Sequence, residues 1–101
     1  MDMEERYRLI ISTILNAIGC QVEVEHMLST GRIDIVASTS RFIYVVELKL
    51  SNNGGINAAE KQIIDNGYLK PFLADDRKVI GLAVELDDMG KGLIDWKEVQ
   101  N

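Results

Sequence analysis

The stretch YVVELKL, residues 44–50, places two charged side chains within a run of strand-forming residues. Valine, tyrosine and leucine are typical of strands that are half-buried or fully buried. Because side chains alternate between the two faces of a strand, Val45, Glu47 and Lys49 share one face and Leu48 lies on the other. Either the charged face is solvated or the pair has a function, since an unpaired ion in a protein core costs several kcal/mol.

The segments around residues 44–50 have the periodicities of helices and strands. The predicted helices cover residues 4–18 and 56–68. The predicted strands cover residues 20–27, 32–37, 42–50 and 78–86, and residues 93–96 can add a short final strand. This α-β-β-β-α-β order predicts an α/β fold in which a central mixed sheet is flanked by helices.

The first three predicted strands favour an antiparallel meander, because the connections between them are short. In the second of these strands, alternation predicts Ile33 and Ile35 on one face. The same alternation puts Asp34 and Val36 on the other face. The strand at 78–86 is almost continuously apolar, as expected for a strand that is covered on both faces.

The composition is that of an ordinary globular domain. The 101 residues are 47% hydrophobic and 27% charged, which predicts one domain spanning residues 1–101. Cys20 is the only cysteine, so no internal disulfide is expected, and a cytoplasmic location is favoured. No apolar run is long enough to predict a membrane span. The net charge of −5 argues against a simple nucleic-acid binder, although a basic rim or a bound metal can reverse the sign within one cleft.

Asp34 lies on one predicted strand, and Glu47 and Lys49 lie on the next. A hairpin can bring the three side chains onto one shared face, although Asp34 taken alone is also compatible with a turn or cap role. Two neighbouring carboxylates repel each other unless a proton or cation lies between them. Mg²⁺ typically takes one or two carboxylates, with water and substrate phosphate completing its shell. A nearby lysine can offset charge that develops on a phosphoryl oxygen. The grouping therefore favours metal-assisted hydrolysis of a phosphodiester.

The motifs GRIDIV, with Asp34, and VVELKL, with Glu47 and Lys49, resemble those of the PD-(D/E)XK nuclease superfamily. The resemblance implies a restriction-endonuclease-like core with the same α-β-β-β-α-β order. More closely, the chain resembles the small C-terminal PD-(D/E)XK domain of AAA-ATPase-like proteins common in Bacteroides-type bacteria. The matching segments also include LNAIG, AAEKQI, NGYLKPFLADD and IDW. One departure is Ile33, which stands where the motif name has proline.

The resemblance implies a role for each matching residue. Asp34 and Glu47 match the acids that bind Mg²⁺ or Mn²⁺, and the backbone carbonyl of Leu48 matches a further metal ligand. Lys49 matches the catalytic lysine. On the second helix, Gln62 matches a polar position that often faces the site. A separate acidic position in the first helix, which can complete the metal shell, corresponds to Glu4.

Several of these residues also have a purely structural explanation. Glu4 is an acid of the kind that the dipole favours at a helix N-terminus. Gln62 can be an exposed helix residue, and Tyr68 is better explained by packing than by stacking on a nucleotide. Gly54 and Gly55 lie between a strand and a helix, as in phosphate-binding loops, but a turn is favoured because the complete motif is missing.

Two functions of different classes remain open from the sequence. The first is a metal-dependent nuclease that acts on nucleic acid, with DNA as the expected substrate. The alternative is a catalytically silent interaction module that serves an AAA-type ATPase, in which case the chain is a fragment or short relative of a longer ATPase-fused protein. A homodimer is a third interpretation, since related nucleases often pair to cut two strands.

Overall fold

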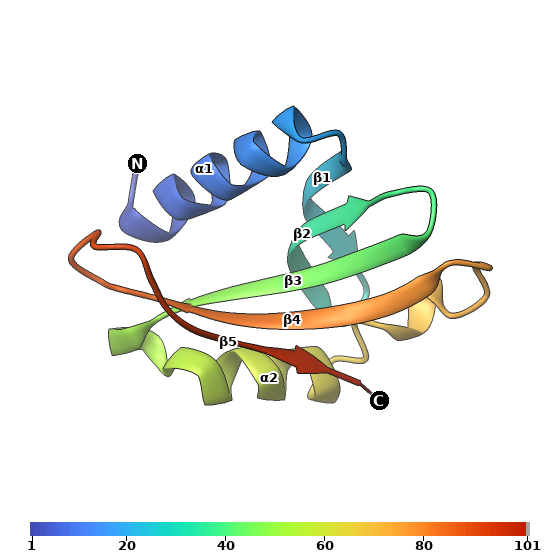
Figure 1. The fold of residues 1–101 in the computed structure, drawn as a ribbon. Coiled ribbons are helices and arrows are strands. Elements are labelled where there is room, and N and C mark those ends of the chain that lie inside the picture. Colours follow the sequence, from blue (N-terminus) through green and yellow to red (C-terminus); the bar gives the residue numbers. More distant parts are fainter. Residues whose placement is uncertain (101) are drawn as a thin grey trace.

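The computed structural model describes residues 1–100, in which two helices pack on a five-stranded sheet (Figure 1). The elements are α1 (Met3–Ala17), β1 (Gln21–Leu28), β2 (Gly31–Ser38), β3 (Phe42–Leu50), η1 (Ser51–Asn53), α2 (Gly55–Asp65), η2 (Lys70–Phe72), β4 (Lys78–Leu86) and β5 (Leu93–Val99). The predicted α/β order is confirmed. The short final strand is also present, and it is seven residues long.

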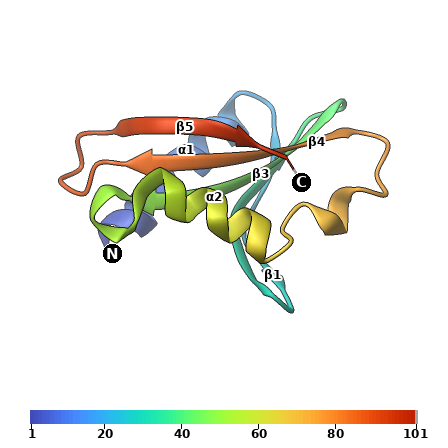
Figure 2. The same ribbon diagram turned by 90° about the horizontal axis from the view of Figure 1, so that it is seen from below.

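The strands follow the order β1-β2-β3-β4-β5 across the sheet. The pairs β1–β2, β2–β3 and β4–β5 are antiparallel, whereas β3 and β4 are parallel, so the predicted meander and mixed sheet are confirmed. Parallel neighbours need a crossover connection, and α2 provides it. In Figure 2, which is seen from below, α2 lies in front of the sheet, and α1 covers the opposite face (Figure 1). Between residues 1 and 100, no helix is both long and apolar enough to cross a membrane.

Each face of the sheet has its own hydrophobic core. On the α2 side, Val45 packs in a cluster with Ala59 and Ile63 of the helix. On the α1 side, Val46 and Leu48 pack in a cluster that also contains Tyr7 of α1. The alternation predicted for β3 is therefore confirmed. Strand β3 is central and covered on both faces. The charged side chains of Glu47 and Lys49 must therefore be buried or lie where these two cores end.

The alternation predicted for β2 is wrong. Ile33 belongs to the cluster on the α2 side, whereas Ile35 belongs to the cluster on the α1 side. Strand β2 is irregular between these two residues, because its register with β1 omits the pair Asp34–Glu25 and Glu25 has a left-handed φ of 55°. The strands keep the same register on either side of this point, so no residue is inserted, yet Ile33 and Ile35 lie on opposite faces of the sheet. Asp34 thus lies at an interruption of the β1–β2 pairing.

The turn between β3 and α2 is built around Gly55, which has a φ of 60°. The Glu85 carboxylate of β4 accepts hydrogen bonds from the Ile56 N–H (2.9 Å) and the Ser51 hydroxyl (2.6 Å), which hold the pKa of Glu85 below its usual value. The turn interpretation of Gly54 and Gly55 is confirmed, because a protein carboxylate occupies the position beside the helix start.

We expect Gly55→Ala to destabilise the protein more than Gly67→Ala does. Both glycines have nearly the same φ, 60° and 62°, so both substitutions cost about 1–2 kcal/mol in the left-handed region. At Gly55 the new Cβ would also lie 2.6 Å from Glu85 Oε1, whereas at Gly67 it would meet only the flexible Lys70 side chain at 3.2 Å. Displacing the carboxylate from its two donors adds about 1–2 kcal/mol. Urea unfolding measures the difference, and equal losses at the two positions would contradict the role of Glu85.

Candidate metal centre

Asp34 and Glu47 lie where strands β2 and β3 separate. The paired register between the strands ends at Ile35–Val46, so the next two residues, Asp34 and Glu47, are not paired through their backbones. Oδ2 of Asp34 instead accepts a hydrogen bond from the backbone N–H of Leu48 at 2.8 Å. The structure therefore brings the two acids together, as the predicted hairpin implies. The side chain of Asp34 accepts the Leu48 N–H in place of a backbone carbonyl of β2.

Both acids are buried, with residue exposures of 4% for Asp34 and 2% for Glu47. The solvated-face interpretation is therefore wrong for Glu47, which occupies the end of the core that contains Val45. Oε1 of Glu47 is buried and has no hydrogen-bond partner among the described residues. Leaving a buried polar atom without a partner costs free energy, and such an atom calls for a specific explanation.

The electrostatics of the pair favour one shared proton in the absence of a cation. Burial, and then the charge of Asp34, raises the pKa of Glu47 to about 9. Burial also raises the pKa of Asp34, but the Leu48 N–H, the Arg8 charge and a hydrogen bond with Glu47 work against that rise. Near neutral pH the raised pKa of Glu47 therefore favours a proton on this carboxyl group beside Asp34. A cation that replaced this proton would allow both groups to ionise.

Lys49 is half-buried two residues after Glu47 on β3. Its charge opposes the rise in the pKa of Glu47, Asp34 and Glu4, which places the ammonium group near all three carboxyl groups. The structure thus brings Lys49 to the same end of the sheet as the two acids.

Glu4 is held on the first turn of α1 by a capping box. Oδ1 of Asp2 accepts the Glu5 N–H at 2.8 Å, and Oε2 of Glu5 accepts the Asp2 N–H at 3.1 Å. Glu4 is half-buried, and its pKa is raised by burial and by the charge of Asp34. Its carboxyl group therefore lies near Asp34, although it does not complete a cluster. In residues 1–100, no three side chains of histidine, cysteine, aspartate and glutamate gather into a metal-binding group.

The backbone of Leu48 also points toward the pair. Its N–H donates to Asp34 on the β2 side of β3. The N–H and C=O of one strand residue point to the same neighbouring strand, so the Leu48 carbonyl is directed toward this side as well.

Gln62 lies on α2, and its side chain is hydrogen-bonded to Tyr68. Its Nε2 donates to the Tyr68 hydroxyl at 3.1 Å, and this hydroxyl donates in turn to the backbone carbonyl of Arg32, also at 3.1 Å. Tyr68 is fully buried, which confirms its packing interpretation. The interpretation of Gln62 as an ordinary exposed helix residue is wrong, because its side chain belongs to this network.

Arg8, a residue of α1 that no sequence motif indicated, also lies at the site, and its side chain is only 12% exposed. Its Nη1 lies 3.9 Å from Oδ1 of Asp34, and its Nη2 lies 2.6 Å from Oε1 of Glu25. One signal for Arg8 was present in the sequence. It follows Glu4 by four residues, and residues at this spacing share a helix face.

The residues present fit a divalent cation of the Mg²⁺ class. Mg²⁺ is bound through oxygen atoms, commonly one or two carboxylates, and keeps several waters. Within residues 1–100, Oε1 of Glu47 has no hydrogen-bond partner, and Oδ1 of Asp34 is the carboxylate oxygen that the Leu48 N–H does not occupy. The incomplete protein shell is compatible with this ion, because water and phosphate oxygens supply the remaining ligands.

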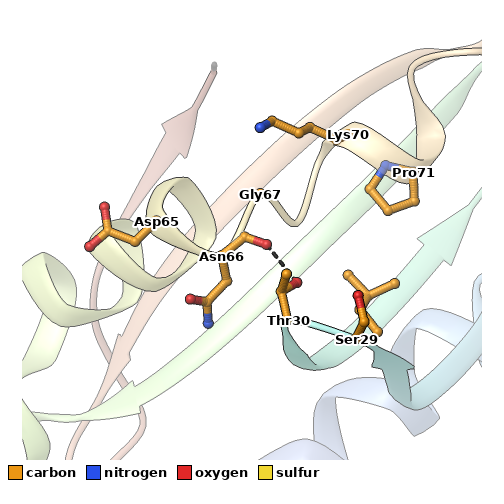
Figure 3. A pocket seen from close by; sticks show the side chains of 8 residues that line it. Ser29, Thr30, Asp65, Asn66, Gly67, Lys70 and Pro71 are labelled. Carbon is orange, nitrogen blue, oxygen red and sulfur yellow. Dashed lines mark hydrogen bonds between the residues drawn. The ribbon is translucent and has the colours of Figure 1, made fainter.

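A separate pocket of about 310 Å³ lies between the β1–β2 turn and the end of α2 (Figure 3). There, the Thr30 hydroxyl donates to the backbone carbonyl of Asn66 at 2.8 Å. The lining contains one acidic and one basic side chain, Asp65 and Lys70. None of the sequence-predicted site residues lines this pocket, so it is distinct from the acid pair.

The fold and the position of the acids define a class of protein. A mixed sheet between helices, with an acid pair at the point where two strands separate, is the arrangement of a restriction-endonuclease-like core. The chain belongs to the PD-(D/E)XK nuclease superfamily, since a model of that superfamily matches residues 2–96. This match confirms the resemblance at the superfamily level. A comparison with curated proteins finds no match.

Proposed function

We propose that the protein is a divalent-cation-dependent nuclease that hydrolyses phosphodiester bonds in nucleic acid. The observation that carries this proposal is the buried Glu47 carboxyl group beside Asp34 in a member of a nuclease superfamily, with one oxygen that has no hydrogen-bond partner in the described part of the chain. Burying two acids together destabilises a fold, and strongly shifted pKa values are typical of functional sites. A site that takes up a cation accounts for an arrangement that packing alone does not require.

In this proposal, Asp34, Glu47 and the carbonyl of Leu48 hold Mg²⁺ or Mn²⁺. When bound, the cation supplies Lewis acidity, which stabilises negative charge on the phosphodiester as water attacks it. Lys49 donates a hydrogen bond to a phosphoryl oxygen and offsets the charge that develops there. Glu4 accepts hydrogen bonds from water at the edge of the site.

The proposed substrate is DNA. The net charge of the chain is −5, so the attraction for phosphate must be local. Lys49 and Arg8 lie beside the acids, and Arg32 is near the Glu25 carboxylate at a distance of 3.8 Å. Together with a bound cation, these groups make this end of the sheet the part of the molecule that we expect to contact the backbone of the nucleic acid.

Two observations favour a second candidate function, a catalytically silent module that serves a partner such as an AAA-type ATPase. The chain is acidic overall, and no third acid side chain joins the pair in the described part of the chain. The resemblance to ATPase-fused domains supplies the class of partner. The two functions predict opposite results when divalent cations are added, because a silent module has no need to bind them.

We expect Lys49→Met to reduce cleavage at least about a hundredfold while Mn²⁺ binding is retained, because the lysine acts on the phosphate rather than on the cation. The assay uses single- and double-stranded DNA and RNA with Mn²⁺, and with EDTA as the blank. Lys78→Met is the matched control, since Lys78 is an exposed lysine on β4 at the opposite end of the sheet. Cleavage by the Lys49 variant at the wild-type rate would refute the assigned role.

A further inference from the structure

We propose that Glu25 holds Arg8 away from Asp34 and thereby keeps one oxygen of Asp34 open to a divalent cation. Glu25 and Arg8 are then positioning residues, because they act through Asp34 rather than on the cation or the substrate. This inference rests on the proposed function and deepens it, since it concerns what controls the affinity of the same site.

The first support is the geometry of a chain of alternating charges. Oε1 of Glu25 lies 2.6 Å from Nη2 of Arg8, which is the distance of a strong charge-assisted hydrogen bond. Nη1 of Arg8 lies 3.9 Å from Oδ1 of Asp34, which is too far for a hydrogen bond. The other oxygen of Glu25, Oε2, lies 3.8 Å from Nη1 of Arg32. Arg8 thus forms a hydrogen-bonded ion pair with Glu25, which lies outside the site. It only approaches Asp34, which lies inside the site.

The second support is burial. The side chains of Arg8 and Asp34 are 12% and 5% exposed, whereas the side chain of Glu25 is 43% exposed. A largely buried guanidinium beside a buried carboxylate has a strong tendency to form a direct pair, because little water screens the two charges. Oδ2 of Asp34 already accepts the Leu48 N–H, so a direct pair would occupy Oδ1. Without a competing acceptor for Arg8, the oxygen that a cation needs would be bonded to the guanidinium.

The third support is the backbone at Glu25. Among residues 1–100, Glu25 is the only non-glycine residue with positive φ, at 55°. It lies opposite Asp34, at the point where the β1–β2 register passes from Val24–Ile35 to His26–Ile33. Positive φ costs free energy for a residue that has a Cβ, and such strain clusters at functional sites. Here the irregular backbone directs the Glu25 side chain toward Arg8 and Arg32.

The cluster is accessible from solvent. A polar cavity of about 160 Å³ borders it. The cavity is lined by Asp2, Glu4, Glu5, Arg8, Glu25 and Arg32. Arg8 therefore has Glu25 and solvent on one side and the buried Asp34 on the other.

The test is a calorimetric Mn²⁺ titration of four proteins: the wild type, Glu25→Gln, Arg8→Met and the double variant. Glutamine keeps the size of Glu25 and its backbone strain, so Glu25→Gln removes only the charge. We expect this change to weaken Mn²⁺ binding by about tenfold or more, because Arg8 then pairs with Asp34. In the Arg8→Met background the same change should alter the affinity by less than about threefold, since no guanidinium is left to block Oδ1.

Glu23→Gln is the matched control. Glu23 is on the same strand, its side chain is 60% exposed and its partner is His26, so this variant removes the same charge without touching Arg8. Equal losses of affinity in Glu23→Gln and Glu25→Gln, or equal effects of Glu25→Gln in the two backgrounds, would overturn the inference and leave the proposed function standing. A folded wild type that binds no Mn²⁺ would overturn both. Urea unfolding checks that each variant is folded, and Glu25→Asn is a second charge-removing variant, because asparagine tolerates positive φ.

Discussion

Replacing Glu47 with glutamine is expected to stabilise the metal-free protein at neutral and alkaline pH. Burial raises the pKa of Glu47 from 4.5 to about 9 in the folded protein, so between these values the folded state holds a proton that the unfolded chain releases. Stability from this group is therefore fully present below pH 4.5 and is lost as the pH rises toward 9. A glutamine amide cannot ionise, and it keeps a donor for Asp34.

The expected effect is large. Linkage gives about 1.4 kcal/mol per pH unit, or about 3 kcal/mol between pH 4.5 and pH 7. The measurement is the free energy of unfolding in urea with EDTA present, at pH 5 and pH 8, for the wild type and Glu47→Gln. The free energy of unfolding of Glu47→Gln should exceed that of the wild type by an amount that grows with pH. Glu98→Gln, a change of an exposed acid on β5, is the control and should show no such growth. Equal pH dependence in the wild type and Glu47→Gln would contradict the shifted pKa of Glu47.

Tyr68→Ala is expected to lower the free energy of unfolding by about 3–5 kcal/mol, because the ring is fully buried in the core beneath the sheet. Tyr68→Phe should cost about 1–3 kcal/mol. The ring would remain, but the backbone carbonyl of Arg32 would lose its donor, and Gln62 and Asn66 would lose their shared acceptor. The hydroxyl joins the end of α2 to the start of β2, which is the strand that carries Asp34.

Urea unfolding of the two Tyr68 variants separates the packing of the ring from the hydrogen bonds of its hydroxyl. Tyr44→Phe is the matched control, since Tyr44 is a half-buried tyrosine on β3. Tyr68→Phe as stable as the wild type would contradict the structural role of the hydroxyl network.

Local patterns predicted most of the fold because the patterns are strong. The apolar run at 78–86 and the alternation in residues 44–50 gave the bounds of β4 and the two faces of β3. Glu47 and Lys49 were found because they interrupt an otherwise apolar strand. Asp34 was found because a hairpin places it beside them, and the acids are indeed adjacent.

The details that the sequence did not predict depend on contacts between distant residues. The pairing of β1 and β2 is interrupted between Glu25, which has a positive φ, and Asp34, whereas alternation within β2 alone put Ile33 and Ile35 on one face. Arg8 reaches Glu25 across 17 positions of the chain, because α1 lies over the β1–β2 hairpin. The burial of Glu47 likewise follows from the helices that cover both faces of β3.

The most direct test of the account is a calorimetric titration of Mn²⁺ into the wild-type protein, with Glu47→Gln measured alongside. The account predicts about one ion bound per chain through the carboxylates of Asp34 and Glu47, with binding accompanied by proton release and lost in the variant. A folded wild type that binds no Mn²⁺ at millimolar concentration, or a Glu47→Gln variant that binds as tightly as the wild type, would contradict it.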